Sequence, residues 1–183
     1  IFGDQVDARV TGLDGGGFVV SWTDQVSSAD GSGYGVFAQR FGADGLPAGS
    51  EFLVNTTTSS SQQESAIAAL NDGGFVAVWQ DNGGADGSSS GVLGQRFDSA
   101  GNPVGGEFQV NTEFSSFQYE PSVSGLSGGG FVVTWTSFTS GSAGDGSGQG
   151  IFAQRYDAAG NPLGGEFLVN TEVTGEQRES GVA

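Results

Sequence analysis

The chain reads GGGFVVSW at residues 15–22, GGFVAVW at residues 73–79 and GGGFVVTW at residues 128–135. The tryptophans that close these stretches lie 57 and then 56 residues apart. A hydrophobic run that returns at a nearly fixed spacing indicates one supersecondary unit, copied along the chain and stacked on its neighbours. A residue present in every copy is therefore expected to serve the scaffold, whereas a residue that differs among copies is expected to serve a local task.

Two further motifs return with a similar spacing. QRF occurs at 39–41, 95–97 and, as QRY, at 154–156, and EFLVNT or EFQVNT occurs at 51–56, 107–112 and 166–171. These motifs divide the 183 residues, taken as a single repeat domain, into repeats at 5–61, 62–117 and 118–176. The chain ends in GEQRESGVA, which matches SQQESAIA at the start of the second repeat, so residues 177–183 are expected to begin a fourth repeat.

Each repeat contains four stretches with the composition of β-strands, separated by Gly-rich and Asn-Pro turns. The expected strands are residues 7–13, 18–22, 35–41 and 51–55, then 64–70, 75–79, 91–97 and 107–111, then 120–126, 131–135, 150–156 and 166–170. The second strand of each set is apolar at consecutive positions, which is typical of a strand buried on both faces. Blades stacked face to face have this property, so the sequence predicts an all-β, β-propeller-like array of four-stranded antiparallel blades. A β-trefoil or a β-prism is the alternative.

The composition is strongly acidic, with 21 Asp and Glu against five basic residues and a net charge of −16. Such a chain lacks the cationic surface that nucleic-acid binding requires. No apolar run approaches the roughly 18 residues of a membrane span. The charge suits a soluble, self-repelling protein, or one that meets divalent cations outside the cell.

Catalysis has few candidate groups, because the chain contains no His or Cys and its basic residues are all arginines. It therefore lacks an imidazole base, a thiolate and a Schiff-base amine. Paired carboxylates, as in glycoside hydrolysis, remain as the alternative. The acids at comparable positions recur in every repeat, whereas an active site is normally single, so we expect no enzyme and no catalytic residue.

The consensus of the repeats is GGFVV(S/T)W followed by DGSGxGVFAQRFDxxGNPxGGEFxVNT. It resembles a tandem β-repeat of large bacterial secreted and surface proteins, which often also carry RTX-type or cadherin-like modules. The resemblance covers essentially the whole chain and implies a cell-surface or secreted location. The repeats, the acidic composition and the extra strand at residues 177–183 indicate a structural or adhesive role, with neighbouring repeats or another copy of the chain, joined through this open strand, as partners. The RTX nonapeptide itself does not occur here as a tandem run, so its calcium site is not carried over.

The loop between the second and third strands carries the candidates for a metal site. Asp-Gly-Ser recurs there and an Asp follows the first two tryptophans, so the candidate calcium ligands are Asp24, Asp30, Asp81, Asp86 and Asp145. Calcium takes roughly six to eight oxygen ligands, and such loops offer carboxylates, hydroxyls and glycine carbonyls. The alternative is an Asp-Gly turn without metal. Ser137 replaces the companion acid in the third repeat, so we expect the first two loops to bind calcium better.

A second functional hypothesis is a lectin-like module that binds surface glycans, or an accessory domain of a secreted polysaccharide enzyme. Its candidate ligand-binding residues are Trp22, Trp79, Trp135, Tyr119, Glu64 and Glu120. Tryptophan has an apolar face that suits a sugar ring, but its recurrence in every repeat favours core packing. The glutamates begin the first strand of their repeats, where they could ring the mouth of a channel. Tyr119 stands at a position that varies among the repeats, where selectivity for a ligand could reside.

Recurring polar residues at the third and fourth strands suggest scaffolding. Each of Arg40, Arg96 and Arg155 precedes a glutamate by eleven residues, at Glu51, Glu107 and Glu166. The hairpin between them predicts a cross-strand ion pair inside each repeat. An Asn-Thr pair follows each fourth strand and is expected to stabilise a turn. We therefore expect a non-catalytic extracellular repeat segment, stabilised by calcium, with glycan binding as the alternative.

Overall fold

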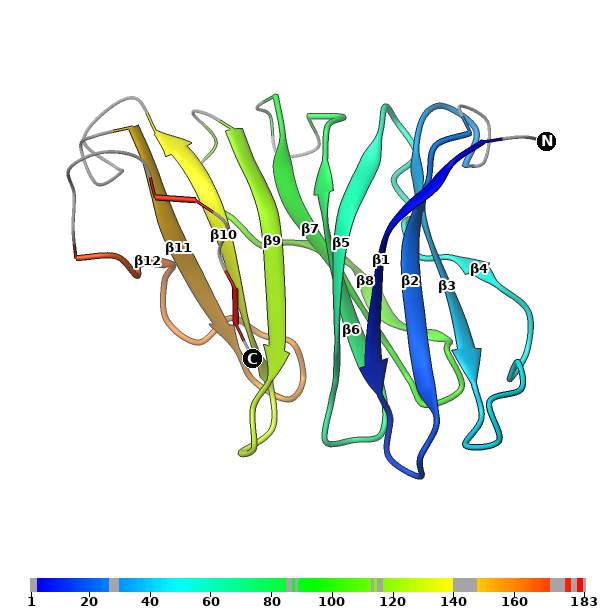
Figure 1. Ribbon diagram of the computed structural model, residues 1–183. Helices are drawn as coiled ribbons and strands as arrows, with labels where there is room; N and C mark the ends of the chain where they lie inside the picture. The colour runs from blue at the N-terminus through cyan, green and yellow to red at the C-terminus, as the bar shows by residue number, and fades with distance from the viewer. Residues whose placement is uncertain are drawn as a thin grey trace.

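The computed structural model describes residues 3–26, 30–84, 87, 89–112, 114, 117–139, 148–171, 177–178 and 181–182. They form three four-stranded antiparallel sheets in which the strands follow chain order, and one repeat builds each sheet (Figure 1). The sheets are β1 (Gln5–Gly12), β2 (Phe18–Asp24), β3 (Gly35–Phe41) and β4 (Phe52–Leu53); β5 (Gln62–Ala69), β6 (Phe75–Asp81), β7 (Gly91–Phe97) and β8 (Pro103–Gln109); and β9 (Phe117–Gly125), β10 (Phe131–Thr139), β11 (Gly148–Tyr156) and β12 (Phe167–Leu168). The predicted β-propeller-like array of four-stranded blades is confirmed.

The first strands of the blades, β1, β5 and β9, lie side by side along the inner edge of the array (Figure 1). They begin two or three residues before the predicted starts, because pairing continues beyond an irregularity near each acid. The fourth strands β4 and β12 are shorter than predicted. Their pairing is continued in part by side chains, since the carboxamide oxygens of Asn55 and Asn170 accept the N–H groups of Val36 and Ile151.

Two apolar cores lie between the blades and hold them together. The core between the first two blades contains Phe75, Trp79 and Phe97 on one side and Val19 and Val36 on the other. The core between the second and third blades repeats this arrangement with the next set of residues. The second strand β6 is buried on both faces from Phe75 to Trp79, as its unbroken apolar run predicts.

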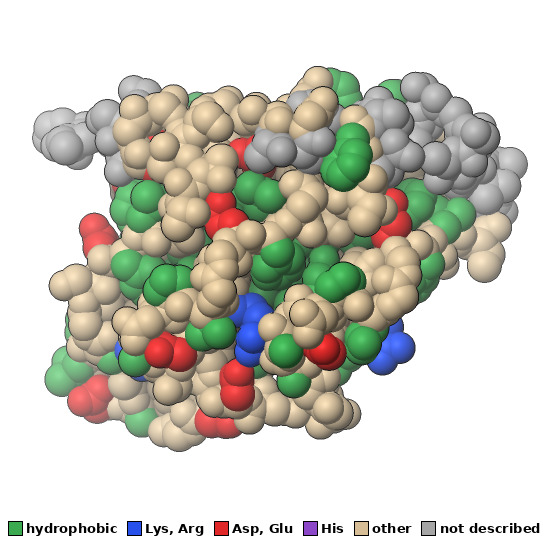
Figure 2. Space-filling model, turned by 180° about the vertical axis from the view of Figure 1, so that it is seen from behind, with side chains coloured by type: hydrophobic (Ala, Val, Ile, Leu, Met, Phe, Trp, Pro, Cys, Tyr) green, Lys and Arg blue, Asp and Glu red, His purple; other side chains and the backbone are tan. Residues whose placement is uncertain are grey.

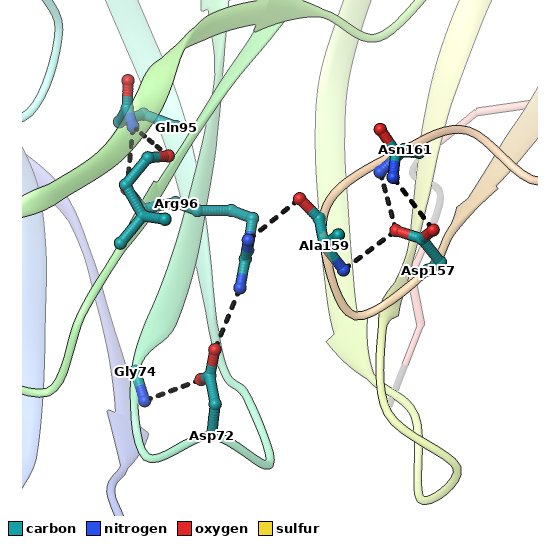
Figure 3. Close-up of polar contacts among 8 residues, drawn as sticks. Asp72, Gly74, Gln95, Arg96, Asp157, Ala159 and Asn161 are labelled. Carbon is teal, nitrogen blue, oxygen red and sulfur yellow. Dashed lines mark hydrogen bonds and ion pairs between the residues drawn. The ribbon is translucent and has the colours of Figure 1, made fainter.

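Recurring arginines join neighbouring blades through the turn between the third and fourth strands. Arg40 donates to the carbonyl of Ala100 in the second blade at 2.9 Å, and Arg96 donates to the carbonyl of Ala159 in the third blade at 3.0 Å (Figure 3). Arg96 also forms an ion pair of 2.9 Å with Asp72 of its own blade. On the outer side of the molecule the basic side chains lie in the lower half (Figure 2).

Recurring glutamates join neighbouring blades in the opposite direction. Glu107 accepts hydrogen bonds from the N–H groups of Thr56 and Thr57 of the first blade. Glu166 accepts the N–H of Thr112 of the second blade at 2.7 Å. The predicted Arg–Glu ion pair inside each blade is therefore wrong for the residues that the structure describes. The chain spacing is compatible with a pair across the hairpin, but Arg40, Arg96, Glu107 and Glu166 reach into adjacent blades instead.

A third recurring contact links the end of one blade to the beginning of the next. The carboxamide groups of Asn55 and Asn111 donate to the side-chain oxygens of Gln62 and Gln118, each at 3.2 Å. Asn170 donates in the same way to Gln177 at 3.3 Å. The described residues after Thr171 thus lie where the first strand of a following blade begins. No helix in the described part of the chain is long and apolar enough to cross a membrane.

Candidate functional site

The acid near the start of each inner strand sits on a β-bulge. Asp7, Glu64 and Glu120 have φ angles of 54°, 54° and 52°, in the left-handed region. At each of these points two residues of the inner strand lie opposite a single residue of the second strand, which is the recurring tryptophan. A left-handed conformation costs a non-glycine residue about 1–3 kcal/mol, and such strain gathers at functional sites.

The bulges bring the three acids together around a shared hollow of about 540 Å³ at the inner strands. Its lining residues come from β1, β5, β9 and the end of the chain: Asp7, Arg9, Val10, Glu64, Ala66, Ile67, Glu120, Pro121, Ser122, Val123 and Val182. We call it the inner hollow. One arginine faces three carboxylates there, so the inner hollow is a site of negative potential.

The inner hollow shifts the pKa of Glu64. Burial raises the pKa of its carboxyl, and the Glu120 and Asp7 carboxylates raise it further. A hydrogen bond from the Glu120 backbone and the charge of Arg9 act against this rise. The Oε2 atom of Glu64 is buried and accepts no hydrogen bond from the residues that the structure describes. A buried acceptor without a donor is costly, so this atom favours a ligand that brings a donor.

A second hollow, of about 450 Å³, adjoins the first and shares Glu64 with it. It lies between the second and third blades, near the ends of β6 and β10, and we call it the aromatic hollow. Its lining residues are Glu64, Gln80, Ser90, Phe117, Tyr119, Phe138 and Gln149. Phe117 is 51% exposed and Phe138 is 39% exposed, which is unusual for side chains of this size.

The aromatic hollow has a fixed wall and an unused acceptor. Ser90 holds the beginning of β9 against the second blade, because its hydroxyl donates to the Gln118 carbonyl at 3.1 Å and its own carbonyl accepts the Gln118 N–H. This pairing orients Phe117 and Tyr119 on either side of Gln118. The Oε1 atom of Gln149 is buried and has no hydrogen-bond partner among the described residues. Two unpaired oxygens, one from Glu64 and one from Gln149, thus lie beside exposed aromatic rings.

The residues of the aromatic hollow depart from the repeat. Phe117 stands where the second repeat has Ser61, Tyr119 where it has Gln63, and Phe138 where it has Asn82. Tyr119 and Glu64 were expected from the sequence as ligand-binding residues, whereas Phe117, Phe138 and Gln149 were not. The signal that could have found them is the loss of repeat identity on either side of Tyr119.

Two of the tryptophans proposed as ligand-binding residues are wrong for that role. Trp79 is fully buried and Trp135 is 1% exposed, so neither presents a face to a sugar. Both lie in the cores between blades, where each packs on the blade before it. Trp22 is partly exposed, because no blade precedes its own in the structure. Glu120 lines the inner hollow and accepts a hydrogen bond from Thr136 at 3.2 Å.

The described candidates for calcium ligands are engaged in hydrogen bonds of the protein. Asp24 accepts the carboxamide of Gln5 and the N–H of Val26, and Asp81 accepts the carboxamide of Gln62. Asp30 accepts the N–H groups of two following residues, as in an Asp-Gly turn, and a further bond from Asn55. No group of three or more His, Cys, Asp or Glu with metal-site geometry occurs in the described part of the chain. Asp86 and Asp145 lie outside the described residues, so calcium binding stays a prediction.

The fold is similar to that of three solved enzymes. An α-L-arabinofuranosidase from Lactobacillus brevis matches at 11% identity over 92% of this chain and 58% of its own, with a TM-score of 0.56. An endo-arabinase from Bacteroides thetaiotaomicron matches at 13% identity over 93% and 64%, with a TM-score of 0.55. A thermostable family-43 glycoside hydrolase matches at 12% identity over 92% and 55%, with a TM-score of 0.57.

This likeness concerns the fold, since the identities are low. The chain spans 55–64% of the length of these three enzymes. No family model matches the sequence, and no curated protein matches it.

Proposed function

We propose that this chain is a carbohydrate-binding β-propeller module, and that a neutral glycan binds in the aromatic hollow beside Glu64. The observation that carries the proposal is the juxtaposition of two unpaired buried oxygens with exposed aromatic rings in one concave site. Binding sites of this kind combine an apolar floor with a few polar groups that fix orientation.

A sugar matches both halves of this site. Its C–H faces pack on aromatic rings such as those of Phe117 and Phe138. Its hydroxyl groups are donors, and they would satisfy Glu64 Oε2 and Gln149 Oε1, which have no donor in the described part of the chain. The nearby carboxylates of Asp7 and Glu120 repel anions, so the glycan is expected to carry no carboxylate or sulfate.

The location of the site within the repeats supports a single binding function. Residues shared by all blades form the scaffold contacts, whereas Phe117, Tyr119 and Phe138 have polar counterparts in the second blade. The resulting surface is asymmetric, as a selective site requires. Under this proposal the protein acts outside the cell, where polymeric glycans are met, which is compatible with the adhesive role that the repeats and the acidic composition indicate.

The first ligands to test follow from the solved enzymes of similar fold, two of which are named for arabinose-containing glycans. We expect isothermal titration calorimetry with neutral oligosaccharides, arabinan fragments among them, to detect binding. Phe117→Ala and Glu64→Gln are expected to weaken it by at least about tenfold each, since the first removes an aromatic ring and the second replaces the charged acceptor with a neutral carboxamide. Phe167→Ala is the matched control, because Phe167 is 47% exposed and lies on β12, outside the hollow.

The same samples distinguish binding from catalysis. Incubation with each ligand and measurement of new reducing ends is expected to show no product. Product formation that Glu64→Gln abolishes would contradict the binding-only proposal and would assign hydrolysis to the inner carboxylates instead. A neutral-glycan panel without any binding, on protein that melts cooperatively, would refute the proposal itself.

A further inference from the structure

The two end blades of the array expose faces that elsewhere form the cores between blades. We call the face of the first blade that is turned away from the second blade the leading face. It carries Phe18, Val20, Trp22, Phe37 and Phe41. All five are partly exposed, whereas their counterparts in the second blade, Phe75, Ala77, Trp79, Leu93 and Phe97, are at most 5% exposed. The rings of the leading face are already ordered, since Phe18 and Phe41 stack at 4.8 Å.

The opposite face belongs to the third blade, at the other end of the array (Figure 1). This trailing face carries Val132, Ile151 and Val169. Val169 is 48% exposed, although its counterparts Val54 and Val110 are each 1% exposed in the cores between blades. The leading and trailing faces therefore have the chemistry of the two sides of one established interface.

The arginine and glutamate side chains that make polar contacts between blades have no described partner at these two faces. The groups on one face complement those on the other. Arg155 is exposed and forms no hydrogen bond or ion pair with another described side chain, while Arg96 reaches the next blade's turn (Figure 3). The acceptor expected for Arg155 is the carbonyl of Asp44. Asp44 lies three residues after Phe41, as Ala100 lies three residues after Phe97, so the two positions correspond.

The turn of the first blade has room for such an arginine. At Gly101 and Gly160 an added Cβ would meet the side chain of an arginine from the preceding blade at 2.9 Å. The counterpart Gly45 has nothing within 4 Å. Glu51 is likewise exposed and without a described partner, whereas Glu107 and Glu166 bind backbone N–H groups of the preceding blade. The matching N–H on the trailing face is that of Thr171.

We propose that the leading face of one copy docks on the trailing face of a second copy, as a blade docks on its neighbour within the chain. Arg155 of the second copy then binds the Asp44 carbonyl of the first copy, and Glu51 of the first copy binds the Thr171 N–H of the second. This contact is heterologous, so it joins copies head to tail. It is independent of glycan binding, because neither face includes the aromatic hollow.

The end of the chain competes for the same position. The side-chain oxygen of Gln177 accepts a hydrogen bond from Asn170, as that of Gln62 does from Asn55. In an incoming copy, β1 would bring Gln5 to the same position. At this end the Gln177 N–H donates to the Gln149 carbonyl at 3.4 Å, and the Val182 N–H donates to the Ser122 hydroxyl at 3.2 Å. Docking of an incoming copy is expected to require their displacement.

Sedimentation velocity from micromolar to millimolar concentration tests the proposal. We expect the wild-type chain to form dimers and larger species as the concentration rises. Trp22→Asp on the leading face and Val169→Asp on the trailing face are each expected to weaken association by at least about tenfold. Glu51→Arg and Arg155→Ala are exposed alternatives, should Trp22→Asp lose its native circular dichroism.

Mixing the two variants tests whether the copies dock head to tail. Trp22→Asp retains an intact trailing face and Val169→Asp an intact leading face, so an equimolar mixture is expected to form one-to-one dimers and nothing larger. Gln177→Ala is expected to tighten wild-type association by removing the competitor. Asp14→Arg, an exposed charge reversal outside both faces, is the control and is expected to change nothing.

Several outcomes would overturn the proposal. A wild-type chain that stays monomeric at millimolar concentration excludes a second copy as the occupant, and the faces then belong to further blades or to another protein. A mixture of variants that remains monomeric excludes head-to-tail docking. Association that Gln177→Ala abolishes would show that the chain end, and not the blade face, makes the contact.

Discussion

At the scale of single residues, the bulge explains why an acid and a tryptophan recur together. The acid takes a left-handed conformation in β1, β5 and β9, and the tryptophan lies opposite the bulge in the paired strand. A glycine would adopt this conformation with less strain, so the presence of Asp or Glu in all three blades points to a use for the carboxylate. In the second blade that use is the open acceptor Glu64 Oε2.

The pH dependence of stability tests the environment of Glu64. Its raised pKa means that the native state holds the proton more tightly than the unfolded chain, whose carboxyl titrates near 4.5. Ionisation of Glu64 therefore destabilises the fold, fully above the raised pKa and not at all below pH 4.5. We expect Glu64→Gln to melt at a higher temperature than the wild type at pH 7, with the difference vanishing as the pH approaches 4.

Asp98→Asn is the control of opposite sign. A hydrogen bond from the Asn102 side chain lowers the pKa of Asp98 from its ordinary 3.8, so its ionised form stabilises the native state above that pH. This variant is expected to melt at a lower temperature at pH 7, and the difference disappears as the pH falls through the lowered pKa. A Glu64→Gln variant that is destabilised at pH 7 would contradict the assigned environment.

At the scale of strands and blades, the contacts that hold the array together are polar as well as apolar. Each internal boundary has an arginine that reaches forward to a turn carbonyl, a glutamate that reaches back to a backbone N–H and an Asn–Gln pair. The same sequence motif therefore has a different environment at the trailing face, which no described blade covers.

Arg96 and Arg155 provide a matched pair for this contact. Arg96 is 9% exposed and bonds both Ala159 and Asp72, so Arg96→Ala is expected to cost about 2 kcal/mol, or about 4–8 °C in melting temperature. Arg155→Ala is expected to cost less than about 0.5 kcal/mol, because its side chain is exposed. Thermal melts at low micromolar concentration, where self-association is weakest, compare the two. Equal losses would show that the contact with the next blade contributes nothing.

The strands were readable from sequence because their signals are local. β3 and β7 have the predicted bounds, and the apolar runs at Phe18, Phe75 and Phe131 mark the second strands. The partners of Arg96 could not be read in the same way, since the spacing to Glu107 suggests a hairpin pair, whereas Arg96 bonds Asp72 of its own blade and Ala159 of the next blade. The bulges were also hidden, because a left-handed Asp or Glu leaves no compositional signal.

The candidate site was only partly readable for a related reason. Glu64 and Tyr119 were found because they occupy conspicuous positions in the repeat. Phe117 and Phe138 come together only when two strands of the third blade pair, as their register shows. Trp79 and Trp135 were misread as ligand-binding residues because the sequence does not tell which side of a blade is covered.

At the scale of the whole molecule, the net negative charge opposes the compact folded state. A net charge of −16 on 183 residues favours expansion, and the inner hollow concentrates three of the acids. A divalent cation that binds only the folded protein would offset this repulsion, by about 2.7 kcal/mol at a hundredfold excess over Kd. Calcium suits Gly-rich loops better than magnesium, whose octahedral geometry is stricter.

We therefore expect millimolar calcium to raise the melting temperature, and magnesium at the same ionic strength to raise it less. Asp30→Asn together with Asp86→Asn is expected to remove most of the rise. Asn at position 30 can still accept the N–H bonds that Asp30 receives from Ser32 and Gly33, so the change tests the charge rather than the turn. Asp145→Asn is expected to matter less, because Ser137 stands where the other blades have Asp24 and Asp81. Identical melting curves in EGTA and in calcium would leave these aspartates as turn residues.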